Sequence, residues 1–216
     1  MSNTERTYLP AAGKDWALPF YDPFVKLFGG DAARKLLIEQ AALSSGLRVL
    51  DIGCGTGTMV VLIKRLHPDV SVVGLDPDPK ALARAKQKAD RDRLSIQFDR
   101  GFSDSLPYAQ ASFDRVFSSL MYHHLPSNEK GNTLREVRRV LRPGGSFHLL
   151  DFAGPSSEKR GFWAGLLHAG EHMPDNAETR VLALLNQAGF ADTRKLAERR
   201  LIFDPLAYYQ ASVPAL

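Results

Sequence analysis

The chain of 216 residues is 44% hydrophobic, enough to bury one sizeable core, so a single domain over residues 1–216 is expected. Its net charge of +4 is modest, and its clustered basic residues lack interleaved aromatic residues, which disfavours a nucleic-acid partner. There is neither an apolar run of about 20 residues for a membrane span nor a signal-like N-terminus, and the single cysteine fits a reducing cytoplasm.

Helices and strands alternate along most of the chain. Apolar spacing predicts helices over 31–43, 58–66, 79–90, 127–141 and 177–188, with a short helix near 103–110. Buried-strand patterns fall at 47–51, 70–76, 94–99, 113–119 and 145–151, and two last strands follow, from 189 to about 197 and near 199–204. The order predicts an α/β fold with a mostly parallel sheet, helices on both faces and an antiparallel C-terminal hairpin at one sheet edge.

The most informative segment is the nonapeptide Val-Leu-Asp-Ile-Gly-Cys-Gly-Thr-Gly at 49–57. After a strand that ends in Asp51, Gly53, Gly55 and Gly57 let the backbone turn sharply and approach a ligand, and the next helix points free N–H groups at this loop. The spacing is neither G-x-G-x-x-G of dinucleotide sites nor a phosphate-binding loop with Gly-Lys-Ser/Thr. Because Asp51 would repel phosphates, it suits a ligand with a cationic amine or sulfonium.

A second acid, Asp76, ends the next predicted strand, about 20 residues after the glycines. An acid at this place accepts hydrogen bonds from both ribose hydroxyls of an adenosine. The competing role is to cap the helix that starts near Pro79, but Asp78 can do that capping. We therefore predict that Asp76 binds a ribose.

These motifs resemble motif I of the class I S-adenosylmethionine (SAM)-dependent methyltransferases, specifically the ubiquinone/menaquinone-type group. Two further stretches carry the resemblance, Phe102-Ser-Asp-Ser-Leu-Pro-Tyr108 with Ser112–Phe117, and Leu141-Arg-Pro-Gly-Gly145. It covers about residues 22–210 and implies a Rossmann-like seven-stranded sheet, SAM as the cofactor and methyl transfer as the activity.

The resemblance implies a set of cofactor-contacting residues at the ends of the first four strands. They are Asp51, Gly53, Cys54, Gly55, Gly57, Thr58, Asp76, Pro77, Phe102, Ser103, Asp104, Ser118, Ser119 and Leu120. Phe102 departs from the family, in which an Asp at this position often bonds the adenine amino group. Adenine recognition then rests on the Ser103 backbone with Phe102 stacked on the base, or on Asp104. Asp114 is expected to be structural.

Tyr122, His123 and His124 follow the fourth strand, where an open parallel sheet faces its ligand. Methyl transfer depends mainly on alignment, and a base is needed only if the acceptor must lose a proton. A histidine, with its ordinary pKa of about 6.5, suits a phenol or an activated carbon acid. All three are candidate catalytic residues; alternatively, one histidine packs and the other caps the next helix.

Residues 1–30 and 152–176 fall outside the alternating pattern, and in the family such segments form a lid over cofactor and acceptor. The predicted acceptor contacts are Tyr21, Trp163, His168 and His172. Residues 168–172 also match the H-x-x-E-H of a zinc-peptidase class. Gly165 and Gly170 weaken the helix which that motif needs, so no metal is predicted.

The sequence thus predicts SAM-dependent methyl transfer to O, N or C of a small, apolar or aromatic acceptor. The alternatives are a SAM-binding protein without transferase activity, or a methyltransferase with a protein or RNA acceptor. Residues 118–122 lack the N/D-P-P-Y/F signature of nucleic-acid amino methyltransferases, which disfavours base amines. The acceptor, the methylated atom and the oligomeric state stay open.

Overall fold

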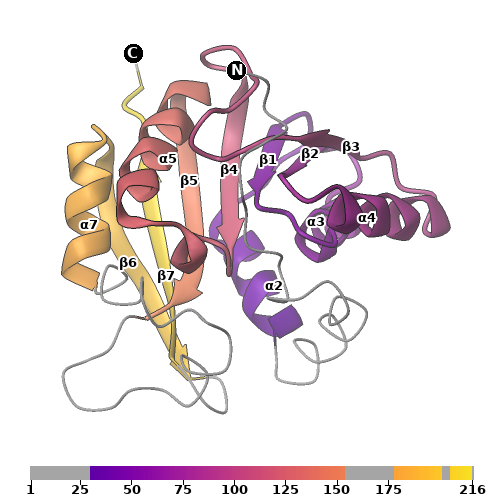
Figure 1. Cartoon of the computed structure of the whole chain (residues 1–216), viewed down its shortest axis with the longest axis horizontal. Coiled ribbons are helices and arrows are strands. Elements are labelled where there is room, and N and C mark those ends of the chain that lie inside the picture. The colour runs from indigo at the N-terminus through magenta and orange to yellow at the C-terminus, as the bar shows by residue number, and fades with distance from the viewer. Residues whose placement is uncertain (1–29, 154–177, 201–204, 216) are drawn as a thin grey trace.

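The computed structural model describes residues 30–153, 178–200 and 205–215, and its strands form one sheet in the order β3-β2-β1-β4-β5-β7-β6 (Figure 1). The strands are β1 (Arg48–Ile52), β2 (Ser71–Asp76), β3 (Gln97–Arg100), β4 (Phe113–Ser119), β5 (Leu141–Phe152), β6 (Ala191–Arg200) and β7 (Pro205–Ser212). The first five strands run parallel, while β7 is antiparallel to both β5 and β6. The predicted fold class, including the C-terminal hairpin, is confirmed.

Helices cover both faces of the sheet because each presents an apolar stripe to it. The helices are α2 (Gly30–Gln40), α3 (Thr58–Leu66), α4 (Pro79–Arg91), the 3₁₀ turn η2 (Tyr122–His124), α5 (Ser127–Val140) and α7 (Glu178–Gln187). One core cluster joins Val137 of α5 and Leu185 of α7 to Phe147. The other joins Ile38 of α2 and Ile63 of α3 to Phe117. None of the helices in the described ranges is long and apolar enough to cross a membrane.

Two predicted elements are wrong. The short helix expected near 103–110 is a series of turns closed by a bridge between Phe102 and Ser105, followed by Pro107, which has no N–H to donate. The last strand, expected near 199–204, is instead β7 at Pro205–Ser212. Because β7 lies between two strands, residues 206–209 are buried on both faces, and this continuous apolar pattern obscured its limits.

The topology places a ligand crevice at the ends of β1 and β4. From β1 the chain proceeds outward through β2 to β3, and then returns to the other side of β1 for β4 and β5. Ligands of open α/β sheets bind at such a reversal of strand order, beyond the carboxyl ends of the strands. Figure 1 shows β1 and β4 side by side at the middle of the sheet.

Candidate active site

The glycine loop after β1 has a backbone that other residues rarely adopt. Gly53, Gly55 and Gly57 have φ angles of 67°, 52° and 80°. A Cβ on Gly57 would lie 2.7 Å from the Cβ of Ala85, so the loop also packs tightly on α4. A Cβ on Gly53 would lie 2.2 Å from Cγ of Met121. The glycine at position 53 therefore accommodates the Met121 side chain, which follows β4, in addition to any ligand.

Asp76 fastens this loop to the end of β2. Its carboxylate accepts hydrogen bonds from the backbone N–H of Gly55, at 2.8 Å, and of Asp78, at 2.9 Å. Asp78 accepts a bond from the N–H of Lys80 at 2.8 Å, which confirms its expected role as the cap of α4. Burial raises the pKa of Asp76 to about 6, although the two N–H bonds oppose that shift. The same carboxylate is where ribose binding is predicted.

Asp51 is the most unusual group of the site. It is 1% exposed, and neither carboxylate oxygen has a hydrogen-bond partner among the described residues. Burial raises its pKa to about 8, against the opposing positive charge of Arg34. A buried carboxyl without a partner is costly, and a cationic ligand group would remove that cost. The orphaned carboxyl and the left-handed glycine loop together fit the ammonium-bearing end of SAM.

The other predicted cofactor contacts surround this loop. Cys54 is buried, with Sγ 2.9 Å from the place of a Cβ on Gly74, and burial raises the pKa of its thiol, which agrees with a small structural side chain. Thr58 begins α3, and the carbonyl of Pro77 accepts a bond from Arg100. The hydroxyl oxygens of Ser118 and Ser119 are buried, with no partner in the described ranges.

Around the predicted adenine position, Phe102 is half-buried and belongs to neither core cluster. The Ser103 hydroxyl lies 3.0 Å from that of Thr133 on α5. Asp104 is also half-buried. Leu120 has a φ of 57°, which turns the chain out of β4. Asp114 accepts a bond from the Arg48 N–H at 2.7 Å, so its expected structural role is confirmed.

A buried histidine–carboxylate pair lies where β4 and β5 end. Nδ1 of His123 is 2.6 Å from Asp151, whose other oxygen accepts the His123 N–H at 2.9 Å. Both side chains are only 2% exposed. Burial alone would raise the pKa of Asp151, but His123 and the backbone N–H of Phe152 hold it below its usual range. Asp151 is thus an ionised partner that fixes the imidazole.

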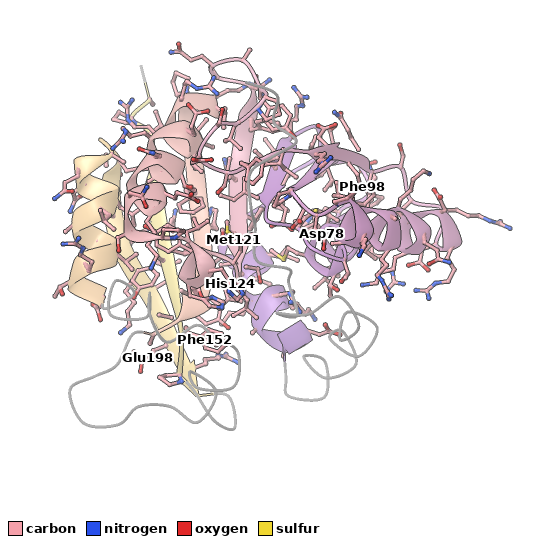
Figure 2. All side chains as sticks on the ribbon, viewed as in Figure 1. Asp78, Phe98, Met121, His124, Phe152 and Glu198 are labelled. Carbon is pink, nitrogen blue, oxygen red and sulfur yellow. The ribbon has the colours of Figure 1, made fainter. Side chains whose placement is uncertain are left out.

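Aromatic rings enclose this pair. The His124 ring lies on that of His123 with centroids 3.9 Å apart, and Phe152 meets His123 edge to face at 4.9 Å. Figure 2 shows Met121, His124 and Phe152 in succession at the end of the sheet. Tyr122 is different, because it is fully buried in the core, with the Lys130 ammonium 5.3 Å from its ring centroid. Its ring contributes to the packing of the core.

The structure adds one site residue that the sequence reading missed. Asp151 lies at the end of an apolar run within one residue of the end of its strand, as Asp51 and Asp76 do, and that shared pattern could have identified it. The predicted acceptor contacts Tyr21, Trp163, His168 and His172 lie outside the described residues.

Known proteins share the motifs and the fold. Residues 49–145 match the family model described as a methyltransferase domain. An uncharacterized methyltransferase of Synechocystis is 34% identical over 172 residues, covering 77% of this chain and 77% of its own length. A demethylmenaquinone methyltransferase of Deinococcus radiodurans is 40% identical over 124 residues, and the match spans 57% of this chain and 51% of that protein.

Two solved structures share the fold. The YcgJ protein of Bacillus subtilis has a TM-score of 0.74 at 18% identity, covering 86% of this chain and 99% of its own. A phosphoethanolamine N-methyltransferase of Haemonchus contortus, in complex with SAM, has a TM-score of 0.72 at 14% identity. The match covers 84% of this chain and 52% of that protein's chain. With the glycine loop and the orphaned Asp51, these findings confirm the resemblance to class I SAM-dependent methyltransferases: the chain belongs to the methyltransferase family, with SAM as its cofactor.

Proposed function

We propose that this protein methylates a carbon or oxygen of a small, hydroxylated aromatic acceptor, and that His123 takes the acceptor's proton. The observation that carries the proposal is the buried pair of His123 and Asp151 at the end of β4 and β5. A relative from Oryza sativa, 31% identical over 159 residues, is a 2-methyl-6-phytyl-1,4-hydroquinone methyltransferase, and hydroquinones carry acidic hydroxyls of this kind.

The cofactor side of the site is proposed to work by placement. Bound SAM supplies a methyl group already activated on a sulfonium, so the protein has to align it with the acceptor. Asp76 is placed to accept the ribose hydroxyls, and Asp51 to bind the ammonium. The glycines of the loop at 53–57 let its backbone approach the cofactor without a Cβ in the way.

The acceptor side is proposed to work by proton transfer. An ionised carboxylate can only accept a hydrogen bond, so Asp151 holds a proton on Nδ1 of His123 and leaves the lone pair on Nε2. Nε2 then removes the hydroxyl proton, and Asp151 stabilises the imidazolium that forms. The deprotonated acceptor has a more electron-rich oxygen and ring, both of which are better nucleophiles.

Further parts of the proposal concern the domain, the acceptor contacts, the secondary catalytic candidates and the location. The single sheet supports one domain over 1–216, with residues 1–30 and 152–176 as a lid. Acceptor contacts are proposed for Tyr21, Trp163, His168 and His172, and His124 and Tyr122 remain secondary catalytic candidates. The free, buried Cys54 supports a cytoplasmic location.

The basic residues at the end of α5 and the start of β5 support a small acceptor over RNA. Arg138 donates to the carbonyl of Gly189, Arg139 pairs with Glu136, and Arg142 pairs with Asp114. These guanidinium groups already have partners within the protein, so they are not presented as a free patch for phosphates.

A screen of acceptor pools with methyl-labelled SAM tests the proposal. We expect label in phenols or hydroquinones, and none in matched pools whose hydroxyls are replaced by hydrogen. Labelling of protein or RNA fractions alone would contradict the small-molecule acceptor. SAM binding without transfer to any pool would favour a binding protein without transferase activity.

A further inference from the structure

The turns at 102–108, part of the connection from β3 to β4, begin beside the carboxylate proposed to bind the ribose. Asp76 and Arg100 are register partners at the ends of β2 and β3, and the N–H of Gly101 donates to the carbonyl of Asp76 at 3.2 Å. Phe102 follows directly in the chain. Because the base of a nucleoside is joined to its ribose, the position of these turns affects how the base is held.

Helix α5 holds these turns with residues along one of its sides. Thr133, Glu136 and Arg139 are spaced three residues apart, so they lie along the same side of the helix. The Thr133 hydroxyl lies 3.0 Å from that of Ser103. The Glu136 carboxylate accepts the backbone N–H of Leu106 at 2.8 Å. Two points of the turns are thus attached to the same helix.

Arg139 fixes the backbone of the turns on their carbonyl side. Its Nη1 donates to the carbonyl of Tyr108 at 2.7 Å, and its Nη2 to that of Leu106 at 3.0 Å. Its Nε and Nη2 also donate to the two oxygens of Glu136, each at 2.7 Å. Bonding to Arg139 lowers the pKa of Glu136, so the carboxylate is ionised and can only accept. Since the donors of a guanidinium point in fixed directions, this arrangement orients both carbonyls relative to α5.

The pair of Glu136 and Arg139 contributes more to position than to stability. The Arg139 side chain is 35% exposed and that of Glu136 is 23% exposed. Ion pairs that water reaches add little to the free energy of unfolding. The same two side chains nevertheless bond the backbone of Leu106 and Tyr108. Their loss should therefore displace the turns without unfolding the protein.

We infer that Glu136 and Arg139 are positioning residues that set the selectivity of the site for adenine, because they fix the turns at 102–108. The inference rests on the expected contact of residues 102–104 with the base, and it deepens the cofactor side of the proposed function. Adenine and its 6-oxo counterpart differ in the group on C6 and in the proton on N1. Hydrogen bonds distinguish such bases only when the protein groups are held in place, because the bonds weaken steeply with distance and angle.

The wild-type protein provides the baseline of the test. S-adenosylhomocysteine, the demethylated product, is compared by calorimetry with S-inosylhomocysteine, which differs only in its 6-oxo base. We expect the adenine ligand to bind roughly 10- to 100-fold more tightly, the effect of hydrogen bonds made to one base and lost with the other. Equal affinity would overturn the inference, because no base contact would remain to be positioned. Methyl transfer in the labelled-SAM screen is a separate readout, so that result would leave the proposed function standing.

Variants of adjacent residues on α5 then locate the effect. Arg139→Gln and Glu136→Gln should each reduce the preference for the adenine ligand about 10-fold. Arg138→Gln is the matched control, because Arg138 also donates to a backbone carbonyl, that of Gly189 at 2.7 Å, which lies outside the turns. This control should keep the wild-type preference.

The ratio of the two affinities separates positioning from a general loss of folding. Unfolded molecules bind neither ligand, so a partly unfolded sample leaves the ratio unchanged. Arg139→Lys keeps the positive charge beside Glu136 but lacks the planar fork, so its preference should lie between those of wild type and Arg139→Gln. If Arg139→Gln and Glu136→Gln retain the wild-type preference, or if Arg138→Gln loses it to the same extent, this pair does not position the turns and the inference is overturned.

Discussion

Asp51 near the end of β1 and Asp151 near the end of β5 are the same residue type, each 1% exposed, at the same edge of one sheet. Asp51 has no hydrogen-bond partner in the described chain, and burial raises its pKa to about 8. Asp151 accepts bonds from His123 and Phe152, and its pKa is lowered. Burial alone therefore does not decide the charge of a carboxyl, since the number of donors around it can reverse the outcome.

This difference separates two halves of the site. The cofactor half keeps a buried carboxyl, Asp51, without a hydrogen-bond partner in the described chain, which costs stability until a ligand binds. The acceptor half is already paired, so its imidazole is oriented before any ligand arrives. Each prediction below alters one half and expects the other to be unaffected.

The largest effect is expected from His123. His123→Ala should lower turnover about 10²–10⁴-fold with little change in SAM affinity, because it removes the proposed base and no cofactor contact. Turnover is measured with an acceptor found by the labelled-SAM screen, and affinity by calorimetry. His124→Ala is the neighbouring control and tests its secondary role. If both variants keep full turnover between about pH 6 and 9, the enzyme works by alignment alone.

Asp151→Asn should destabilise the protein by about 1–3 kcal/mol, the scale for leaving buried hydrogen-bonding groups without their charged partner. It should also reduce turnover, because the amide can leave His123 in the wrong tautomer. Urea unfolding measures the first effect and the acceptor assay the second. Asp51→Asn is the matched control, for which no loss of stability is expected. A stable Asp151→Asn variant with full turnover would mean that the pair has no role in positioning His123.

Asp76→Ala should weaken SAM binding by about 1–3 kcal/mol through loss of charged hydrogen bonds to two ribose hydroxyls. It also removes the acceptor of the Gly55 N–H, so apo stability is measured alongside. Asp78→Asn keeps a capping side chain on α4 and serves as the control. Unchanged SAM affinity in Asp76→Ala would contradict ribose binding at this position.

The smallest effect concerns the pH dependence of apo stability. Asp51 keeps its proton in the folded protein up to about pH 8 and loses it near pH 4 when unfolded, so its contribution falls as pH rises through that window. Asp76, whose pKa is about 6, acts in the same direction at lower pH, and buried His148, with a pKa lowered to about 3, acts oppositely below about pH 6.5.

Between about pH 6.5 and 8, Asp51 dominates among these three groups, with a slope approaching 1.4 kcal/mol per pH unit. Asp51→Asn should flatten this slope. The control Asp69→Asn, a change at an exposed position, should leave the slope unchanged. Thermal unfolding of the apo proteins across this range is the measurement. An equal slope in Asp51→Asn and wild type would show that Asp51 is already ionised in the folded protein.

The parts of the site that the sequence predicted are local. A strand ending in an acid, the alternating glycines and the Asp78 cap are each specified within a few residues, so periodicity and turn chemistry were sufficient. The missed parts depend on the folded chain. Asp151 is 28 residues from His123 and meets it only because β4 and β5 are neighbours. The burial of the Tyr122 ring also depends on the folded chain, because one residue in a 3₁₀ turn changes which way a side chain points.

The contact between Gly53 and Met121 links the two halves through shape. Any side chain at position 53 would collide with Met121, even if its backbone could adopt the φ of 67°. A smaller residue at 121 would create space above the loop, and a larger one would press on the cofactor side. Across homologues, positions 53 and 121 should therefore change together, so that a new acceptor preference gained at the end of β4 is constrained by the shape of the cofactor loop.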